Sequence, residues 1–137
     1  MSVDIKSTLR DAETIAVVGL SGRTVRTSHQ IARKLQRASY TIIPVNPNYE
    51  EILGEPVVPD LSQIPEDVTV DIINIFRASE HTASVVEDAI SFSETREQTP
   101  VVWTQLDVSS PEAEALAEEA NLPYVRNRCI AVELARM

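Results

Sequence analysis

Short apolar runs alternate along the chain with stretches whose apolar residues recur at helical spacing. The runs predict strands over 14–19, 40–45, 70–76, 101–104 and 124–125. The helical spacing predicts a short leading helix over 3–10, a longer one over 28–38, and others that begin near Ser79, Ser110 and Ile130. Strands that alternate with helices form mostly parallel sheets with helices on both faces.

This alternation predicts a single α/β domain over residues 1–137 with a Rossmann-like, doubly wound parallel sheet. Because crossover connections between parallel strands are right-handed, we expect the five main strands in the order 3-2-1-4-5. The second and third strands are joined by residues 49–65, which contain several prolines and predict little regular structure beyond one helical turn at 61–64.

Polar and charged side chains follow each strand of the predicted sheet. In an open α/β sheet the ligand crevice lies outside the carboxyl ends of the strands, so these residues are candidates for a site. The candidate residues, including the glycines and the proline of the turns, are Gly19, Ser21, Gly22, Arg23 and Arg26 after the first strand and Asn46, Pro47 and Asn48 after the second. Arg77 and Ser79 follow the third strand, Gln105 follows the fourth, and Asn127 and Arg128 follow the fifth. Arginine binds phosphate through bidentate hydrogen bonds, so the cluster predicts an anion site. The alternative is that these arginines pair with surface carboxylates.

The turn after the first strand resembles a phosphate-binding unit, because a strand leads through a glycine-bearing turn to a helix that Ser28 can cap. It does not complete the G-x-G-x-x-G dinucleotide pattern, since Ser21 stands where the second glycine belongs. The second strand ends in Asn46-Pro47-Asn48, without the acid that holds the ribose of NAD. Both departures weigh against NAD, and a tight turn alone is the simpler reading of the glycines.

The composition excludes several classes of partner. A hydrophobic content of 43% in 137 residues suits one packed domain, and no apolar run is long enough to cross a membrane. The polar amino terminus has no signal-peptide core, which favours the cytoplasm. A net charge of −9 argues against nucleic acid and anionic membranes as partners. Abundant acids with only two lysines, Lys6 and Lys34, predict adaptation to high salt.

Cysteine and histidine are too few to suggest a metal centre or a catalytic set. Cys129 is the only cysteine, so an intramolecular disulfide and a cysteine-based metal cluster are excluded. His29 and His81 stand alone at the starts of two predicted helices, and we expect His29 to face solvent. No nucleophile, base and orienting group can be assembled, so no catalytic residue is assigned.

Several motifs occur in the same order as in a known family. They are Val18-Gly19-Leu20-Ser21, the stretch from Ile43 to Asn48, Ile52-Leu53-Gly54-Glu55, Phe76-Arg77-Ala78-Ser79, Val102-Trp103-Thr104-Gln105, and Arg128-Cys129-Ile130 with Glu133. Taken together, they resemble the small stand-alone CoA-binding proteins, which are similar to the CoA-binding domain of the succinyl-CoA synthetase α subunit. The resemblance covers nearly the whole chain.

The resemblance implies a Rossmann-like domain that binds coenzyme A or an acyl-CoA. Backbone N–H groups from Gly19 through Leu20, Ser21 and Gly22 to Arg23 would take the pyrophosphate, beside Ser28 at the helix start. Arg23 or Arg26 would hold the 3′-phosphate, and Asn46, Pro47 and Asn48 would line the nucleotide. Phe76, Arg77 and Ser79 would close over the ligand, with Gln105 beside the pantetheine arm. Asp107 departs from the family, because relatives often have glycine there, and this puts the fourth loop in doubt.

The resemblance favours a binding protein that is not catalytic by itself, because neither histidine lies in a motif that matches the phosphorylated histidine of the ligases. Two alternatives stay open: a small NAD(P)-dependent or acyl-transfer enzyme, and a CoA- or redox-responsive regulatory module that uses Cys129. A homodimer and a complex with a partner enzyme are both compatible with the sequence.

Overall fold

The computed structural model describes residues 3–137, which form an α/β domain. The helices are α1 (Ile5–Asp11), α2 (Thr27–Arg37), α3 (Ser79–Arg96), α4 (Pro111–Glu119), α5 (Ile130–Ala135) and the single 3-10 turn η1 (Leu61–Gln63). The strands are β1 (Thr14–Val18), β2 (Thr41–Val45), β3 (Glu51–Ile52), β4 (Glu55–Pro56), β5 (Ile72–Ile75), β6 (Val101–Thr104) and β7 (Tyr124–Val125). All five predicted main strands are present.

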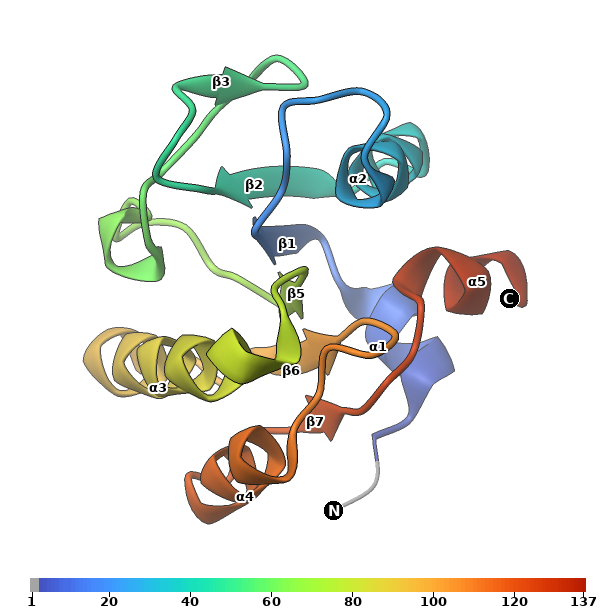
Figure 1. Ribbon diagram of the computed structural model, residues 1–137. Helices are drawn as coiled ribbons and strands as arrows, with labels where there is room; N and C mark the ends of the chain where they lie inside the picture. The colour runs from blue at the N-terminus through green and yellow to red at the C-terminus, as the bar shows by residue number, and fades with distance from the viewer. Residues whose placement is uncertain (1–2) are drawn as a thin grey trace.

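The main sheet is parallel and has the order β2-β1-β5-β6-β7 (Figure 1). The predicted doubly wound fold is confirmed, but the predicted strand order is wrong: the third main strand, β5, lies beside β1 and not beyond β2. Pro44 explains the difference. Its carbonyl accepts from Val58 N at 3.0 Å on the outer side of β2, so its missing N–H also lies on that side. A strand with proline there is an edge strand.

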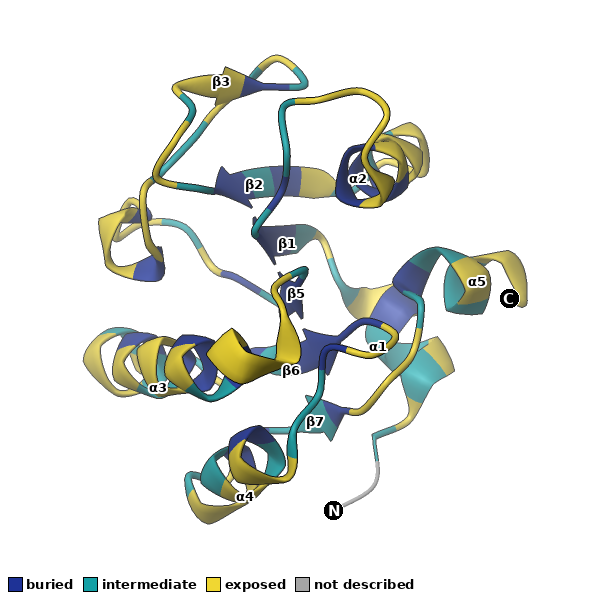
Figure 2. Ribbon diagram, viewed as in Figure 1, coloured by how far each residue is buried: buried dark blue, intermediate teal, exposed yellow. Residues whose placement is uncertain are grey.

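Helices cover both faces of the sheet, and the sheet separates the core into two clusters (Figures 1 and 2). Helices α3 and α4 pack with η1 on one face, where Phe92 and Ala113 belong to the same core cluster as the strand residues Ile73 and Ile75. Helices α1, α2 and α5 cover the other face, and their buried side chains surround Trp103. Because side chains alternate along a strand, each central strand contributes to both clusters.

The helix starts differ in part from the predictions. Helix α4 begins as expected, because the Ser110 hydroxyl accepts from Ala113 N at 3.1 Å. Helix α2 begins one residue early, at Thr27 after the N-cap Arg26, so Ser28 is not the predicted cap. Ser79 is the first residue of α3 and not its cap. Of the three predicted caps, only Ser110 therefore caps its helix, and Ser28 and Ser79 do not.

The connection between β2 and β5 has more structure than predicted. A two-stranded antiparallel hairpin, β3-β4, precedes the expected turn η1. Arg96 of α3 holds this segment in place by donating to the carbonyls of Ser62, Ile64 and Pro65 at 3.2, 2.6 and 3.2 Å. The segment is thereby fixed against α3, beside the carboxyl end of β1.

Candidate functional site

Gly19 brings the end of β1 against the end of β5. Its φ of +85° lies in the left-handed region, and a Cβ there would stand 2.3 Å from the carbonyl oxygen of Phe76. Its N–H donates to Val45 O at 2.9 Å. Only glycine fits these constraints. The turn therefore starts between β1 and β5, where the sheet reverses its winding direction and where open α/β sheets bind ligands.

The first turn uses much of its own hydrogen-bonding capacity. Ser21 N donates to the Ser28 hydroxyl at 3.0 Å, and Arg23 N donates to the Ser21 hydroxyl at 3.1 Å. His29, which we expected in solvent, is buried and its Nδ1 lies 2.9 Å from Ser21 O. Within the described chain, the N-cap Arg26 provides no side-chain hydrogen bond to α2. The backbone donors of this region without a described acceptor therefore include those of Leu20, Gly22 and the first turn of α2.

The second loop is tied to the first by Asn46. Its Nδ2 donates to Leu20 O at 3.0 Å, and its Oδ1 accepts from Asn48 N at 2.9 Å. The Leu20 side chain is fully buried in the core, so it is a packing residue and only its backbone borders the turn. Pro47 and Asn48 are exposed. The asparagine after β2 thus supports the loops where NAD-binding folds place a ribose-binding acid.

The contact between Tyr49 and Gly22 was not predicted from the sequence. A Cβ built on Gly22 would lie 2.5 Å from Cε1 of the Tyr49 ring, so the ring rests directly on the glycine backbone. Tyr49 is half-buried and packs against the cluster around α2. The loop after β1 and the loop after β2 are therefore joined by the side-chain hydrogen bond of Asn46 and by the contact of the Tyr49 ring with Gly22.

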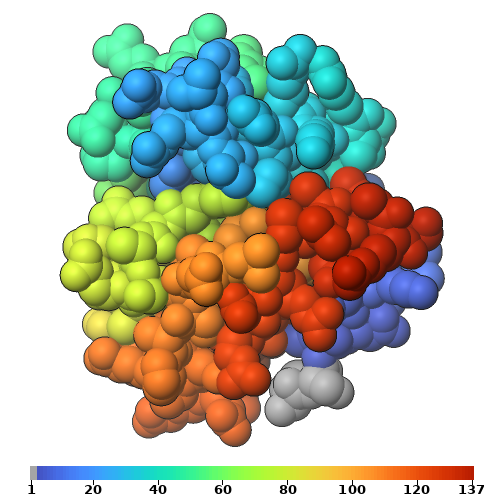
Figure 3. Space-filling model, turned by 45° about the vertical axis from the view of Figure 1, so that its right-hand side comes forward, coloured from blue at the N-terminus to red at the C-terminus, as the bar shows by residue number. Residues whose placement is uncertain are grey.

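A cleft of about 200 Å³ opens at the carboxyl ends of β1 and β2. The cleft brings together three predicted site residues that are distant in sequence, Gly19, Pro47 and Arg77. The rest of its lining comes from Val18, Val45, Pro59, Asp60, Leu61, His81, Ser84, Val85 and Asp88. The segments that follow β1, β5, β6 and β7 gather on one face of the molecule (Figure 3). The expectation that the strand-end loops converge is therefore met.

Three arginines at this edge carry uncompensated charge. Among the described residues, Arg23, Arg26 and Arg77 make no ion pair within 4.0 Å. The arginines after β7 do pair: Arg126 contacts Glu114 at 3.4 Å and Arg128 contacts Glu133 at 3.2 Å. The arginines after β7 thus fit the interpretation that they pair with surface carboxylates. The arginines near β1 and β5 fit the interpretation that they bind an anion.

The cleft also contains carboxylates on the side of α3. Burial raises the pKa of Asp88 above its ordinary value of 3.8, and the nearby charges of Asp60 and Glu87 raise it further. Asp60 accepts from Ser62 N at 2.9 Å and so caps η1. The lining of the cleft therefore combines one guanidinium, that of Arg77 after β5, with the two carboxylates of Asp60 and Asp88.

Gln105 lies on the α5 side of the sheet and is buried. Its Oε1 accepts from Ile130 N at 3.0 Å at the start of α5. Phe76 is half-buried, and Arg77 and Ser79 are exposed at the start of α3. Gln105 thus has a structural contact in addition to the ligand role that the resemblance implies.

The fourth loop adopts the conformation that glycine favours. Asp107 has a φ of +62°, and its N–H donates to Asn127 Oδ1 at 2.7 Å. Aspartate tolerates the left-handed region better than most residues. The backbone of the fourth loop therefore has the left-handed conformation that a glycine at position 107 would adopt, and Asp107 adds a carboxylate to the loop.

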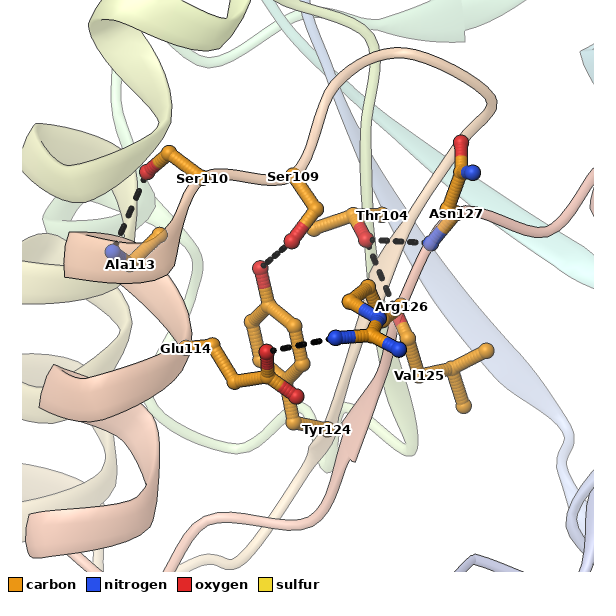
Figure 4. Close-up of polar contacts among 9 residues, drawn as sticks. All are labelled: Thr104, Ser109, Ser110, Ala113, Glu114, Tyr124, Val125, Arg126 and Asn127. Atoms are coloured by element: carbon orange, nitrogen blue, oxygen red, sulfur yellow. Dashed lines mark hydrogen bonds and ion pairs between the residues drawn. The ribbon is translucent and has the colours of Figure 1, made fainter.

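A polar network holds the fourth and fifth loops together (Figure 4). The Thr104 hydroxyl donates to Val125 O at 2.8 Å and accepts from Asn127 N at 3.0 Å. Ser109 Oγ and Tyr124 Oη lie 2.7 Å apart. Burial raises the pKa of Tyr124 above its ordinary value of 10.0. The network fixes β7 and the start of α4 without forming a cleft toward the strand ends.

Within residues 3–137 no group of three histidine, cysteine or acidic side chains could hold a metal ion. Cys129 is half-buried and precedes α5. Over the same residues no helix is both long and apolar enough to cross a membrane. The polar groups at the strand ends are therefore the candidate site.

Comparisons with known proteins show the family to which the chain belongs. A family model described as a CoA binding domain matches residues 13–135. The uncharacterized protein YneT of Bacillus subtilis (strain 168) is 41% identical over 129 residues, which cover 94% of this chain and 90% of YneT. The solved structure of a hypothetical protein from Pyrococcus horikoshii OT3 superposes with a TM-score of 0.88 at 34% identity, covering 97% of this chain and 89% of that one.

One relative is part of a much larger enzyme. The acetate–CoA ligase [ADP-forming] I of Archaeoglobus fulgidus is 39% identical over 61 residues, which cover 44% of this chain and only 9% of the ligase. The family model covers nearly all of the chain, and a relative of similar length exceeds 30% identity. The resemblance found in the ordered motifs is therefore confirmed, and the chain belongs to the CoA-binding domain family.

Proposed function

We propose that this protein binds coenzyme A or an acyl-CoA at the carboxyl edge of its sheet and is not catalytic by itself. The observation that carries the proposal is the cleft at the carboxyl ends of β1 and β2, where Gly19 and Arg77 meet in a member of the CoA-binding family. A ligand with an anionic head and a neutral tail matches a cleft whose lining includes Arg77, with Arg23 and Arg26 in the neighbouring loop after β1.

The phosphates would lie near the start of α2. The first turn of α2 offers backbone N–H groups, and the helix dipole favours negative charge there. This assignment refines the sequence-based prediction, because the N–H groups of Gly19, Ser21 and Arg23 already donate within the protein. The 3′-phosphate would be held by Arg23 or Arg26, which are exposed and without an ion pair among the described residues.

Arg77 would close the site from the β5 side. Its Cδ lies 3.1 Å from the position of a Cβ on Gly19, so the side chain extends across the first turn. From that position the guanidinium reaches an anion bound at the turn and makes charge-assisted hydrogen bonds. Asn46, Pro47 and Asn48 would border the nucleotide, with Asn46 acting through its support of Leu20 O.

Replacing Arg77 tests the proposal. Arg77→Ala should weaken CoA binding by about 1–3 kcal/mol in isothermal titration calorimetry, because a charge-assisted hydrogen bond is lost. Arg10→Ala is the matched control, since Arg10 is also exposed but lies in α1, away from the strand ends. Equal CoA affinity in the Arg77 variant and the wild type would remove Arg77 from the site.

A further inference from the structure

Asn74 is a buried polar side chain without a partner. It lies inside β5 with no solvent exposure, and neither its Oδ1 nor its Nδ2 makes a hydrogen bond. Among the described residues these are the only buried side-chain nitrogen and oxygen atoms in that state. Burying a carboxamide is unfavourable unless it is hydrogen-bonded, and native proteins pair nearly all such groups. The unpaired amide therefore points to a group that bonds to it in another state of the protein.

The sheet register shows which way Asn74 faces. Its neighbours across the sheet are Val17 of β1 and Trp103 of β6, and both belong to the cluster covered by α1, α2 and α5. Ile73 and Ile75, which alternate with it, belong to the opposite cluster. Asn74 therefore faces the α2 and α5 layer, beside the indole of Trp103.

Asn74 lies one row beneath the carboxyl edge of the sheet, on the face toward α2 and α5, whereas Val18, Val45, Leu61 and Val85 in the lining of the cleft belong to the cluster on the α3 face. The next residues on the same face toward the carboxyl edge are Gly19, Phe76 and Gln105, which continue β1, β5 and β6. Phe76 is half-buried on the same strand, and Gln105 is a second buried carboxamide. Only the Oε1 of Gln105 has a described partner, the N–H of Ile130. Two carboxamides thus occupy adjacent rows directly below the strand ends.

We propose that Asn74 hydrogen-bonds the amide-bearing pantetheine tail of the ligand, an inference that rests on the proposed CoA site. An amide presents one donor and one acceptor, which complement the free Nδ2 and Oδ1 of Asn74. Phe76 is two residues further along the same strand and on the same face, so the tail must pass Phe76 to reach the carboxamide. The unpaired carboxamide disfavours the ligand-free state, and its hydrogen bonds in the complex favour the bound one.

The test compares whole CoA with adenosine 3′,5′-bisphosphate, which lacks the tail. Asn74→Leu, nearly isosteric, should weaken CoA binding about tenfold, the loss of one or two buried hydrogen bonds, and leave the bisphosphate affinity unchanged. The melting temperature of the ligand-free variant should not fall, because an unpaired polar group has been removed. Asn74→Val repeats the test with a smaller side chain if the leucine variant fails to fold.

Thr104→Val is the matched control. Thr104 is also fully buried, but it is hydrogen-bonded and its register partner Ile75 faces the opposite cluster. This variant should lower the melting temperature and leave CoA affinity unchanged. Trp103, the only tryptophan, gives a second readout in the wild type. Its fluorescence should change with CoA and not with the bisphosphate, because only the tail reaches the neighbouring Asn74.

Three results would overturn the inference while the proposed function stands. They are unchanged CoA affinity in the Asn74 variants, an equal loss of affinity for both ligands, and a Trp103 response that is the same for both. A lower melting temperature with unchanged CoA affinity would assign Asn74 to a buried water instead. If the wild type bound neither ligand, the proposed function itself would fall, and this inference with it.

Discussion

The contact between Gly22 and Tyr49 gives a quantitative prediction for the site. Gly22 has no left-handed backbone, so Gly22→Ala introduces a clash without strain in φ. The new Cβ would lie 2.5 Å from Cε1 and 2.8 Å from Cδ1 of the Tyr49 ring, closer than real Cβ contacts. The half-buried ring must shift, and such overpacking costs about 1–3 kcal/mol of unfolding free energy. Because the ring braces the first turn, CoA affinity should fall as well.

A double-mutant cycle isolates this contact. Once Tyr49→Ala has removed the ring, Gly22→Ala should cost nothing or stabilise the protein by about 0.4–1 kcal/mol, through the unfolded state. The assay is chemical unfolding in urea, followed by circular dichroism. Gly54→Ala is the control that introduces backbone strain without a clash, since Gly54 has a φ of +78° and no atoms within 4 Å of an added Cβ. An equal cost of Gly22→Ala with and without the ring would refute the reasoning.

Three further predictions concern the loops and the cleft. Asp107→Gly should change the unfolding free energy by less than about 1 kcal/mol, whereas Asp107→Val should cost about 1–2 kcal/mol in urea unfolding, because a β-branched residue resists the left-handed region; equal costs would contradict the described backbone. Tyr124→Phe should cost about 1 kcal/mol in the same assay, because Ser109 loses its partner; unchanged stability would argue against that bond. The raised pKa of Asp88 means that its ionised form is less favourable in the folded state than in the unfolded one. Asp88→Asn should therefore raise the melting temperature at pH 7, with a gain that fades as the pH falls through the raised folded-state pKa toward 3.8 and is absent below it, and a lower melting temperature at pH 7 would count against it.

The fold class could be read from the sequence because hydrophobic periodicity determines which segments become strands and helices. The strand order could not be read in the same way, since it depends on which edge of β1 receives the third strand. Pro44 held the missing information, because a proline inside a strand marks an edge. The position of Pro44 in β2 argues against an order in which β2 lies between two other strands of the sheet.

The candidate site was predicted in its location and only partly in its contacts. The strand ends do converge, and Gly19 and Arg77 meet there as expected. Leu20 and Ser28 were assigned to the ligand, and that role stays a prediction. The structure adds that the Leu20 side chain is buried in the core and that the Ser28 hydroxyl accepts from Ser21 N. Tyr49 was missed because its contact joins two loops, and no local pattern specifies such a pair.

Asn74 shows the limit of pattern reading most directly. In the sequence it is one polar residue within the apolar run of 70–76, and a central strand of a parallel sheet is expected to be apolar. Only the register and the burial of the strand reveal that its carboxamide has no partner. Polar residues that interrupt a buried strand just below a candidate site therefore merit separate attention in related chains.

Titration calorimetry of the wild-type protein with CoA, dephospho-CoA, NAD and ATP tests the central claim most directly. The account predicts saturable binding of CoA, weaker binding of dephospho-CoA because Arg23 or Arg26 loses the 3′-phosphate, and no comparable binding of NAD. Tight binding of NAD with none of CoA would contradict the account.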